Sequence, residues 1–344
     1  MTDTTSRVVL ITGGSKGIGL ACARHFAALG DRVAVTYNSS PPASEFFAVK
    51  CDVTDTDQVN AAFDAVEAHF GPVQVLVSNA GITKDTLILR MSEDDFATVL
   101  DANLTAAFRV CKRATQGMLR ARSGRIILIS SVVGMLGSAG QANYAASKAG
   151  LVGLGRSLAR ELGSRSITVN VVAPGPVDTE MTAALNEKQM QQITDAVPLA
   201  RTATVDEIAG VVTFLASPAA AYITGAIIPV DGGLGMGHES RSLHPKSFRS
   251  ILYLQVRKHT ARSNNMDQQL FDRFTKCAVE VLSVDASKIV PTAHFSDDLD
   301  ADSLDLVELV MALEEEFGIE VPESDLEGVD TIGKAFDLVT SKVK

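Results

Sequence analysis

A series of short, apolar, β-branched runs through the first 238 residues most constrains how this chain can fold. Stretches with helical periodicity separate the runs, which read RVVLI, RVAVTY, FFAVK, VQVLV, RIILIS, ITVNVV and GAIIPV. Strands that alternate with helices form βαβ units, in which the strands are parallel and helices cover both faces of the sheet. We therefore predict an α/β fold with a doubly wound parallel sheet for this part of the chain.

Charge divides the chain into three parts. The net charge of the 344 residues is −10, yet residues 1–238 are nearly balanced. Residues 239–265 contain six basic residues and one acidic residue, whereas residues 266–344 contain six basic and nineteen acidic residues. The last part also shows amphipathic helical patterns, among them SLDLVELVMALEEEFG, with Leu306, Val310, Leu313 and Phe317 on one stripe. We predict an α/β domain over 1–238, a basic linker over 239–265 and a small all-α helical bundle over 266–344.

Composition excludes several classes of protein. An acidic chain without tryptophan does not suit nucleic-acid binding. Residues 208–230 carry no charge, but Pro218 and Pro229 interrupt them, so we predict a buried helix, a turn and a strand in place of a membrane span. The N-terminus has no apolar run typical of a signal peptide, which favours the cytoplasm. The widely spaced cysteines predict neither a metal site nor disulfides and fit a reducing compartment; they are Cys22, Cys51, Cys111 and Cys277.

A glycine-rich segment, TGGSKGIG at residues 12–19, follows the first predicted strand. Gly13, Gly17 and Gly19 allow a tight turn and let the backbone approach a pyrophosphate at a helix N-terminus. The spacing differs from the common G-x-G-x-x-G pattern, and an ordinary glycine-rich turn is the alternative. The position between a strand and an amphipathic helix favours a dinucleotide site in a Rossmann-type sheet.

The end of the second predicted strand indicates which dinucleotide binds. An acidic residue at this place binds the ribose 2′-hydroxyl of NAD and repels a 2′-phosphate. Tyr37, Asn38 and Ser39 are neutral, and Lys16 in the glycine-rich segment is placed to pair with a phosphate. We therefore predict NADPH over NADH, with a solvated Lys16 as the alternative.

A tyrosine and a lysine four residues apart suggest redox chemistry. Tyr144 and Lys148 share one face of a predicted helix, and Ser131, which follows RIILIS, can reach the same pocket. A nearby ammonium favours the phenolate and lowers the phenol pKa, which makes tyrosine a usable proton donor beside a nicotinamide. The Y-x-x-x-K pattern alone is common, and two ordinary helical residues are the alternative.

Taken in order, these motifs resemble the short-chain dehydrogenase/reductase family. The matching set is TGGSKGIG, NAG at residues 79–81, Ser131, YAASK and APGPVDT, and it covers nearly all of residues 1–238. Within the family, GRIILISSVVGMLGSAGQANYAASKAG and IPVDGG are most similar to the bacterial 3-oxoacyl-[acyl-carrier-protein] reductases, and GLGMGH is similar to actinobacterial versions. The resemblance implies that substrate choice depends on lid residues around positions 181–193.

The resemblance implies a role for each matching residue. Tyr144 would be the general acid, and Lys148 would lower its pKa and hold the nicotinamide ribose. Ser131 would hydrogen-bond the substrate carbonyl, and Asn103 would hold a water molecule that feeds protons to the site. Asp52 and Val53 would lie beside the adenine, residues 79–81 along the cofactor, and residues 174–179 beside the nicotinamide. The resemblance implies that Tyr144 and Lys148 also contact the cofactor. The further cofactor contacts that it implies are Gly13, Ser15, Lys16, Gly17, Ile18, Gly19, Asn38, Asn79, Ala80, Gly81, Pro174, Gly175, Val177 and Thr179.

The segment DADSL at residues 300–304 has two interpretations. It is typical of a helix N-terminus that Asp302 or Ser303 caps, and a helix N-terminus also favours a bound phosphate. The longer segment DLDADSLDLVELVMALEEEFGIEVPE resembles the acyl carrier proteins. That resemblance implies 4′-phosphopantetheine on Ser303, attached by a phosphopantetheinyl transferase, and a partner-facing surface made of Leu304, Val307, Glu308 and Met311.

The two resemblances together predict an NADPH-dependent 3-oxoacyl thioester reductase of fatty-acid synthesis that carries its own acyl carrier module. The reductase family further implies a homotetramer, docking of the carrier domain of its own or another chain at Arg122 and Arg165, and other fatty-acid synthesis enzymes as partners. One alternative is a reductase for acetoacetyl-CoA or a polyketide-type ketone. Another is a carrier or scaffold protein with a secondary reductase body. The linker is either functional or a translated gene boundary or fusion scar.

Overall fold

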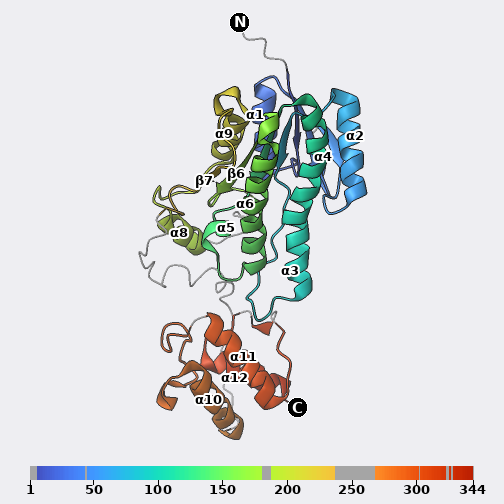
Figure 1. The fold of residues 1–344 in the computed structure, drawn as a ribbon. Coiled ribbons are helices and arrows are strands. Elements are labelled where there is room, and N and C mark those ends of the chain that lie inside the picture. The colour runs from blue at the N-terminus through green and yellow to red at the C-terminus, as the bar shows by residue number, and fades with distance from the viewer. Residues whose placement is uncertain are drawn as a thin grey trace. The chain divides into compact units, whose positions relative to one another are not determined.

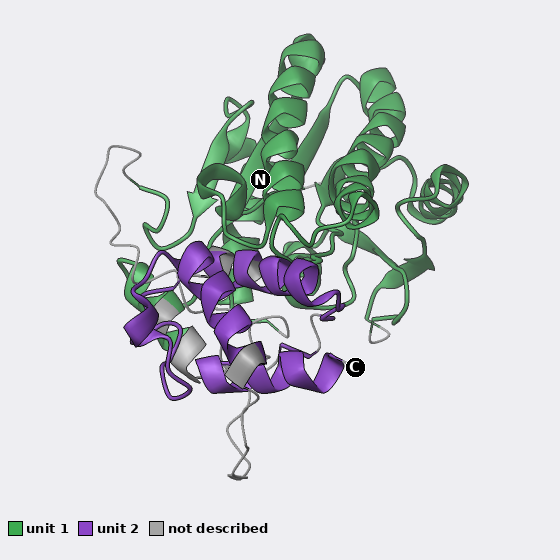
Figure 2. Cartoon of the chain, turned by 90° about the horizontal axis from the view of Figure 1, so that it is seen from below, with its two compact units in different colours: residues 1–241 green, residues 242–344 purple. Residues whose placement is uncertain are grey.

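The chain forms two compact units, Met1–Arg241 and Ser242–Lys344, which Figure 2 shows in green and purple. The computed structural model describes residues 6–42, 45–179, 187–236, 268–301, 303–322, 325–326 and 328–343. The predicted linker over 239–265 and residues 181–186 of the predicted substrate-selecting segment lie outside these ranges. Each unit is therefore described by itself.

The first unit is built on a seven-stranded parallel sheet in the order β3-β2-β1-β4-β5-β6-β7. The step from β1 to β4 in the middle of the sheet is the place where the winding reverses, so the predicted doubly wound Rossmann-type fold is confirmed. The strands are β1 (Val8–Ile11), β2 (Arg32–Tyr37), β3 (Phe47–Lys50), β4 (Val75–Ser78), β5 (Gly124–Ile129), β6 (Ile167–Pro174) and β7 (Ile227–Val230).

Two apolar layers hold helices on the two faces of the sheet (Figure 1). Successive side chains of a strand point to opposite faces, so Val8 and Leu10 join one layer while Val9 and Ile11 join the other. The first layer is covered by α2 (Thr56–Phe70), α4 (Ala106–Ala121) and α6 (Ala142–Leu162), and the second by α1 (Gly17–Ala28) and α9 (Val205–Ala216). Shorter elements near the site are α3 (Glu93–Leu100), the π-helix η1 (Asp101–Thr105), α5 (Val133–Leu136) and α8 (Glu187–Ala196).

The uncharged segment 208–230 folds as the sequence predicts. It supplies most of α9, the 3-10 helix η3 (Pro218–Ala220) and β7. A capping box formed by Thr204 and Glu207 begins α9. In the part of the chain that the structure describes, no helix is long and apolar enough to cross a membrane.

The second unit is a small helical bundle, as predicted. It contains α10 (Gln268–Leu282), the 3-10 helix η4 (Ala286–Lys288), α11 (Ser303–Phe317) and α12 (Ile332–Lys342). Phe274 and Phe336 are almost completely buried and meet edge to face, with ring centroids 5.6 Å apart. On α11, Leu313 is buried as predicted, but Leu309, which lies outside the predicted stripe, is buried as deeply.

Candidate active site and carrier module

The sequence motifs of the first unit meet at the edge of the sheet where the parallel strands have their carboxyl ends. The glycine-rich segment follows β1, NAG follows β4, Ser131 follows β5, and Gly175 follows β6. These four strands are neighbours in the sheet, so the segments that follow them lie next to one another.

Side-chain hydrogen bonds join the glycine-rich segment to NAG. Asn79 Nδ2 donates to the carbonyl oxygens of Thr12 at 3.1 Å and Gly13 at 3.0 Å. Thr12 Oγ1 in turn accepts from the backbone N–H groups of Asn79 and Ala80. A Cβ on Gly19 would lie 2.3 Å from the Gly13 carbonyl oxygen, so only glycine allows this close packing.

The N-terminus of α1 fits a pyrophosphate. The helix begins at Gly17, whose φ of 54° lies in the left-handed region that favours glycine. Its N-cap residue, Lys16, contributes no capping hydrogen bond from its side chain, and the first turn of α1 carries no acidic residue. The helix dipole and the first N–H groups therefore favour an anion at this position.

The residues predicted to contact the adenosine half lie at the neighbouring strand ends. Asn38 is exposed at the end of β2, and among residues 37–42 none is acidic. Asp52 follows β3, and its Oδ1 accepts hydrogen bonds from the backbone N–H of Thr54 at 2.9 Å and from its hydroxyl at 2.7 Å. Asp52 thus shapes its own loop, in which Val53 is half-buried.

Ser131, Tyr144 and Lys148 form one cluster. Tyr144 and Lys148 lie one turn apart on α6, and a hydrogen bond joins the hydroxyls of Ser131 and Tyr144. Lys148 Nζ lies 5.5 Å from the centroid of the Tyr144 ring and donates to the Ile129 carbonyl oxygen at 2.9 Å. The cluster can therefore hold a carbonyl oxygen, donate a proton to it and keep a cation close by.

The lowering of the Tyr144 pKa by Lys148 stays a prediction, and the surroundings of Tyr144 act against it. Burial raises the pKa of Tyr144; the hydrogen bond with Ser131 acts in the opposite direction, and the charge of Asp85 raises the pKa further. Burial also lowers the pKa of Lys148 to about 8. Because the low-dielectric environment disfavours both the phenolate and the ammonium, desolvation is the larger effect.

Asn103 is held at the back of the cluster by the π-helix η1, and only 2% of its surface is exposed. Its Oδ1 accepts from the Ile82 N–H at 2.8 Å, and its Nδ2 donates to the Ile82 carbonyl oxygen and to Ser147 Oγ, each at 3.0 Å. A Cβ on Gly81 would lie 2.9 Å from Asn103 Oδ1 and 3.5 Å from Lys148 Nζ. The cluster and NAG are thus in direct contact.

A buried acidic residue that the sequence analysis missed shapes the loops beside the predicted nicotinamide contacts. Asp231 accepts hydrogen bonds from the N–H groups of Gly233 at 2.9 Å and Gly235 at 2.8 Å. A Cβ on Gly175 would lie 2.7 Å from the Asp231 Cα, so Gly175 must be glycine for the two loops to meet. The acid followed by two glycines in IPVDGG was the signal that could have revealed this contact. Pro174 and Val177 are buried, and Thr179 is half-buried.

The predicted docking arginines do not flank this site within one chain. Arg122 ends α4 with a φ of 51°, and Arg165 ends the 3-10 helix η2 (Gly163–Arg165). Both are exposed, and they precede β5 and β6 at the amino ends of these strands. That edge of the sheet is opposite to the one that bears Ser131 and Tyr144, because all strands run in parallel.

In the second unit, α11 begins at Ser303, the residue predicted to carry the prosthetic group. Asp302 and the side chains of Ser303, Leu304 and Val307 lie outside the described residues. Glu308 and Met311 are exposed on α11. The helix therefore presents both acidic and apolar side chains to solvent.

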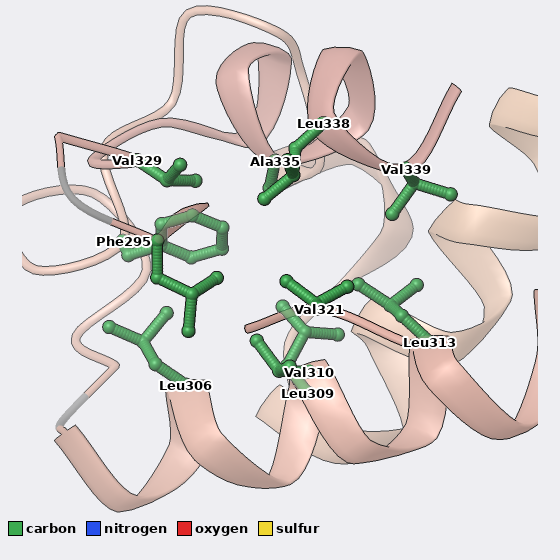
Figure 3. Close-up of a pocket in the computed structure, with 11 residues that line it drawn as sticks. Phe295, Leu306, Leu309, Val310, Leu313, Val321, Val329, Ala335, Leu338 and Val339 are labelled. Carbon is green, nitrogen blue, oxygen red and sulfur yellow. The ribbon is translucent and has the colours of Figure 1, made fainter. Parts of the chain in front are cut away.

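An apolar pocket lies inside the second unit, between α11 and α12 (Figure 3). Aliphatic side chains and one phenylalanine line it, and none of the described lining residues is charged. The lining residues are Phe295, Leu306, Leu309, Val310, Leu313, Val321, Leu326, Val329, Ala335, Leu338 and Val339.

Comparisons with known proteins divide the chain in the same way. Residues 13–235 match a family described as enoyl-(acyl carrier protein) reductase, and residues 272–339 match a phosphopantetheine attachment site. The chain is 56% identical to the 3-oxoacyl-[acyl-carrier-protein] reductase MabA of Mycobacterium tuberculosis strain H37Rv over 233 residues, which cover 68% of this chain and 94% of the relative. It is 45% identical to the 3-oxoacyl-[acyl-carrier-protein] reductase FabG of Escherichia coli K12 over 238 residues, or 67% of this chain and 98% of the relative.

Proposed function

Because the chain belongs to the short-chain dehydrogenase/reductase family and carries a phosphopantetheine attachment domain, we propose that it reduces 3-oxoacyl thioesters to 3-hydroxyacyl thioesters with NADPH in fatty-acid synthesis. The observation that carries the proposal is the cluster of Ser131, Tyr144 and buried Lys148 at the sheet edge that bears the glycine-rich segment. The second unit is then the carrier that presents the acyl group.

The residues of the cluster divide the work of ketone reduction. Bound NADPH supplies the hydride that is added to the carbonyl carbon. Ser131 stabilises the oxygen on which negative charge develops, and Tyr144 donates its proton to that oxygen. Lys148 compensates the charge on the phenolate that remains. Since burial raises the pKa of Tyr144, the phenol is protonated at neutral pH and ready to donate.

The cofactor preference follows from the end of β2. Tyr37, Asn38 and Ser39 offer no carboxylate to bind a ribose 2′-hydroxyl, and Lys16 at the start of α1 supplies a positive charge for a 2′-phosphate. We expect kcat/KM with NADPH to exceed that with NADH, and Lys16→Gln to reduce this preference. An equal preference in the wild-type protein would contradict the assignment.

The carrier module acts through Ser303. A phosphodiester to this serine would place a flexible thiol arm at the start of α11, where the helix dipole favours the phosphate. The apolar pocket between α11 and α12 suits an acyl chain in transit. Attachment to the reductase raises the concentration of carrier near the active site to about the millimolar range.

The experiment that tests the reductase assignment is a comparison of three substrates. The full chain is supplied with NADPH and a 3-oxoacyl group on a separate carrier protein, the same group on coenzyme A, or a trans-2-enoyl group on the carrier. We expect the carrier-bound 3-oxoacyl group to give the highest kcat/KM. Faster reduction on coenzyme A would support the small-ketone alternative, and faster reduction of the enoyl group would overturn the proposed reaction.

The proposed partners are a phosphopantetheinyl transferase, the carrier domain of its own or another chain, and other fatty-acid synthesis enzymes. We also propose a cytoplasmic homotetramer. A tetramer would allow Arg122 and Arg165 of one chain to approach a carrier that serves another, although they do not flank their own cleft. Light scattering of the purified chain gives the oligomeric state, and a monomer would contradict this arrangement.

A further inference from the structure

An irregular segment of the first unit, residues 82–86, is hydrogen-bonded to the turn that starts the catalytic helix α6. Three hydrogen bonds join the two: Thr86 N–H to the Gly140 carbonyl oxygen at 2.8 Å, Gln141 Nε2 to Asp85 Oδ2 at 2.7 Å, and Asn143 Nδ2 to the Lys84 carbonyl oxygen at 2.9 Å. Three consecutive residues, Lys84 to Thr86, thus contact three of the four residues that precede Tyr144. The start of α6 is fixed by this segment and not by a capping side chain.

The same segment reaches the other end of the site. Ile82 exchanges two hydrogen bonds with Asn103, as described above. Asn143, which has no exposed surface, accepts a hydrogen bond from the Tyr144 N–H at 2.7 Å. Residues 82–86 therefore connect Asn103 to Tyr144, and Asp85 is the one member whose ionised side chain makes part of the connection.

We infer that Asp85, held by Gln141, is a positioning residue: it fixes the start of α6 and thereby keeps Tyr144 in place beside Ser131 and Lys148. The inference rests on the proposed function, in which Tyr144 is the acid. No motif of the sequence analysis includes Asp85, whereas Gln141 lies within the segment at residues 124–150.

The charge of Asp85 has a second, electrostatic effect, which acts on Tyr144. Lys148 on α6 and the Ser131 hydroxyl after β5 both favour the phenolate, whereas Asp85 is the acidic group that raises the pKa of Tyr144. The neighbouring charges of Lys84 and Asp95 form an ion pair with each other. The Asp85 side chain is exposed, yet partial desolvation raises its pKa, and the hydrogen bond from Gln141 counteracts this effect by favouring the carboxylate.

Two substitutions separate the geometric part of the role from the electrostatic part. Asp85→Asn retains an oxygen that can accept from Gln141 but removes the charge. Asp85→Ala removes both. Glu161→Gln is the matched control, since it also removes one carboxylate from the reductase but lies exposed at the far end of α6, about 25 Å along the helix from Tyr144. At that distance its charge is screened at ordinary ionic strength.

The experiment measures three quantities in the full chain: kcat and KM for 3-oxoacyl reduction, the dissociation constant of NADPH, and the titration of Tyr144 by tyrosinate absorbance. Subtracting the same protein with Tyr144→Phe isolates Tyr144 from the other tyrosines. We expect Asp85→Ala to lower kcat about 10-fold or more, with NADPH binding unchanged. Asp85→Asn should retain most of the wild-type kcat at neutral pH. In this variant Tyr144 should titrate at a pH lower than in the wild-type protein by about half a unit to one unit.

The outcomes test the electrostatic role, the positioning role and the proposed function separately. The electrostatic role is wrong if Tyr144 titrates at the same pH in Asp85→Asn as in the wild-type and Glu161→Gln proteins. It is also wrong if Tyr144 does not titrate in any of these three proteins before the protein unfolds. If Asp85→Ala retains the wild-type kcat, the positioning role is wrong. Absence of 3-oxoacyl reduction in the wild-type protein itself would instead overturn the proposed function, so the two failures are distinguishable.

Discussion

The two units of this chain place their functional groups in opposite ways. In the reductase unit the chemistry depends on a connected set of buried polar side chains, such as Asn103, Ser147 and Lys148, with the backbone of the glycine-rich segment beside them. In the carrier unit the proposed function depends on one serine, Ser303 at the start of α11, and on an apolar interior. Substitutions at many positions should disrupt a buried network, whereas a carrier should be disrupted only by substitutions at its attachment site and in its core. Substitutions should therefore separate the two activities.

The largest expected effect is at the attachment site. Ser303→Ala removes the only oxygen that the proposed phosphodiester uses, so incubation with a phosphopantetheinyl transferase and coenzyme A should give no increase in intact mass. Reduction of a coenzyme A-bound 3-oxoacyl substrate should be unchanged, because the cluster in the first unit is untouched. Ser287→Ala, in the same unit, is the control and should be modified fully. Modification of Ser303→Ala would show that another residue carries the group.

The second-largest effect is expected at Tyr144, the proposed general acid. Tyr144→Phe removes the transferable proton and should lower kcat about 10²- to 10⁴-fold, while the NADPH dissociation constant stays within a few-fold of wild type. Tyr222→Phe is the matched control, because the Tyr222 side chain is fully exposed. Modification of Ser303 should be normal in both variants. Near-normal turnover of Tyr144→Phe would remove Tyr144 as the proton donor.

A core substitution in the carrier should destabilise only that unit. Leu313 is 3% exposed and lines the pocket, so Leu313→Ala should reduce the free energy of unfolding of the carrier by about 2–5 kcal/mol. Met311→Ala on the same helix is 49% exposed and should cost far less. The free energy of unfolding of each unit is measured by hydrogen exchange at increasing denaturant concentration. Equal loss of stability in the reductase unit would mean that the two units do not unfold independently.

The smallest effect concerns the stability cost of the buried lysine. Burial lowers the pKa of Lys148 from 10.5 to about 8, so the folded state binds this proton less tightly than the unfolded state. The cost is fully present below about pH 8 and is relieved as the pH rises toward 10.5. Lys148→Met should therefore lose activity but gain about 1 kcal/mol of stability at pH 7, and this gain should shrink between pH 8 and 10.5. A gain that does not change with pH would contradict the assignment of its cause.

Features that depend on neighbours along the chain could be predicted from the sequence. The glycine-rich segment and the Tyr144–Lys148 pair were recognisable because their geometry is set within one loop and one helical turn. Alternating runs predicted the sheet, because strand and helix periods differ. The helices of the second unit were recognisable for the same reason.

Features that depend on tertiary contacts could not be predicted. The contact of Asp231 with Gly175 and the bond between Asp85 and Gln141 join residues 56 apart along the chain in each case. The upward shift of the Tyr144 pKa could not be predicted, because burial is a property of the folded unit. The edge on which Arg122 lies follows from strand direction, which the local sequence does not reveal.

The most direct test of the account is a reaction within one chain. The full-length protein is loaded on Ser303 with a 3-oxoacyl phosphopantetheine group, freed of all other thioesters and mixed with NADPH, and its intact mass is followed in time. The account predicts that the acyl group gains two hydrogens while an equivalent amount of NADPH is consumed, and that Tyr144→Phe prevents both changes. A group that stays unreduced, in a preparation that still reduces the same acyl group on a separate carrier, would contradict the claim that this chain reduces what it carries.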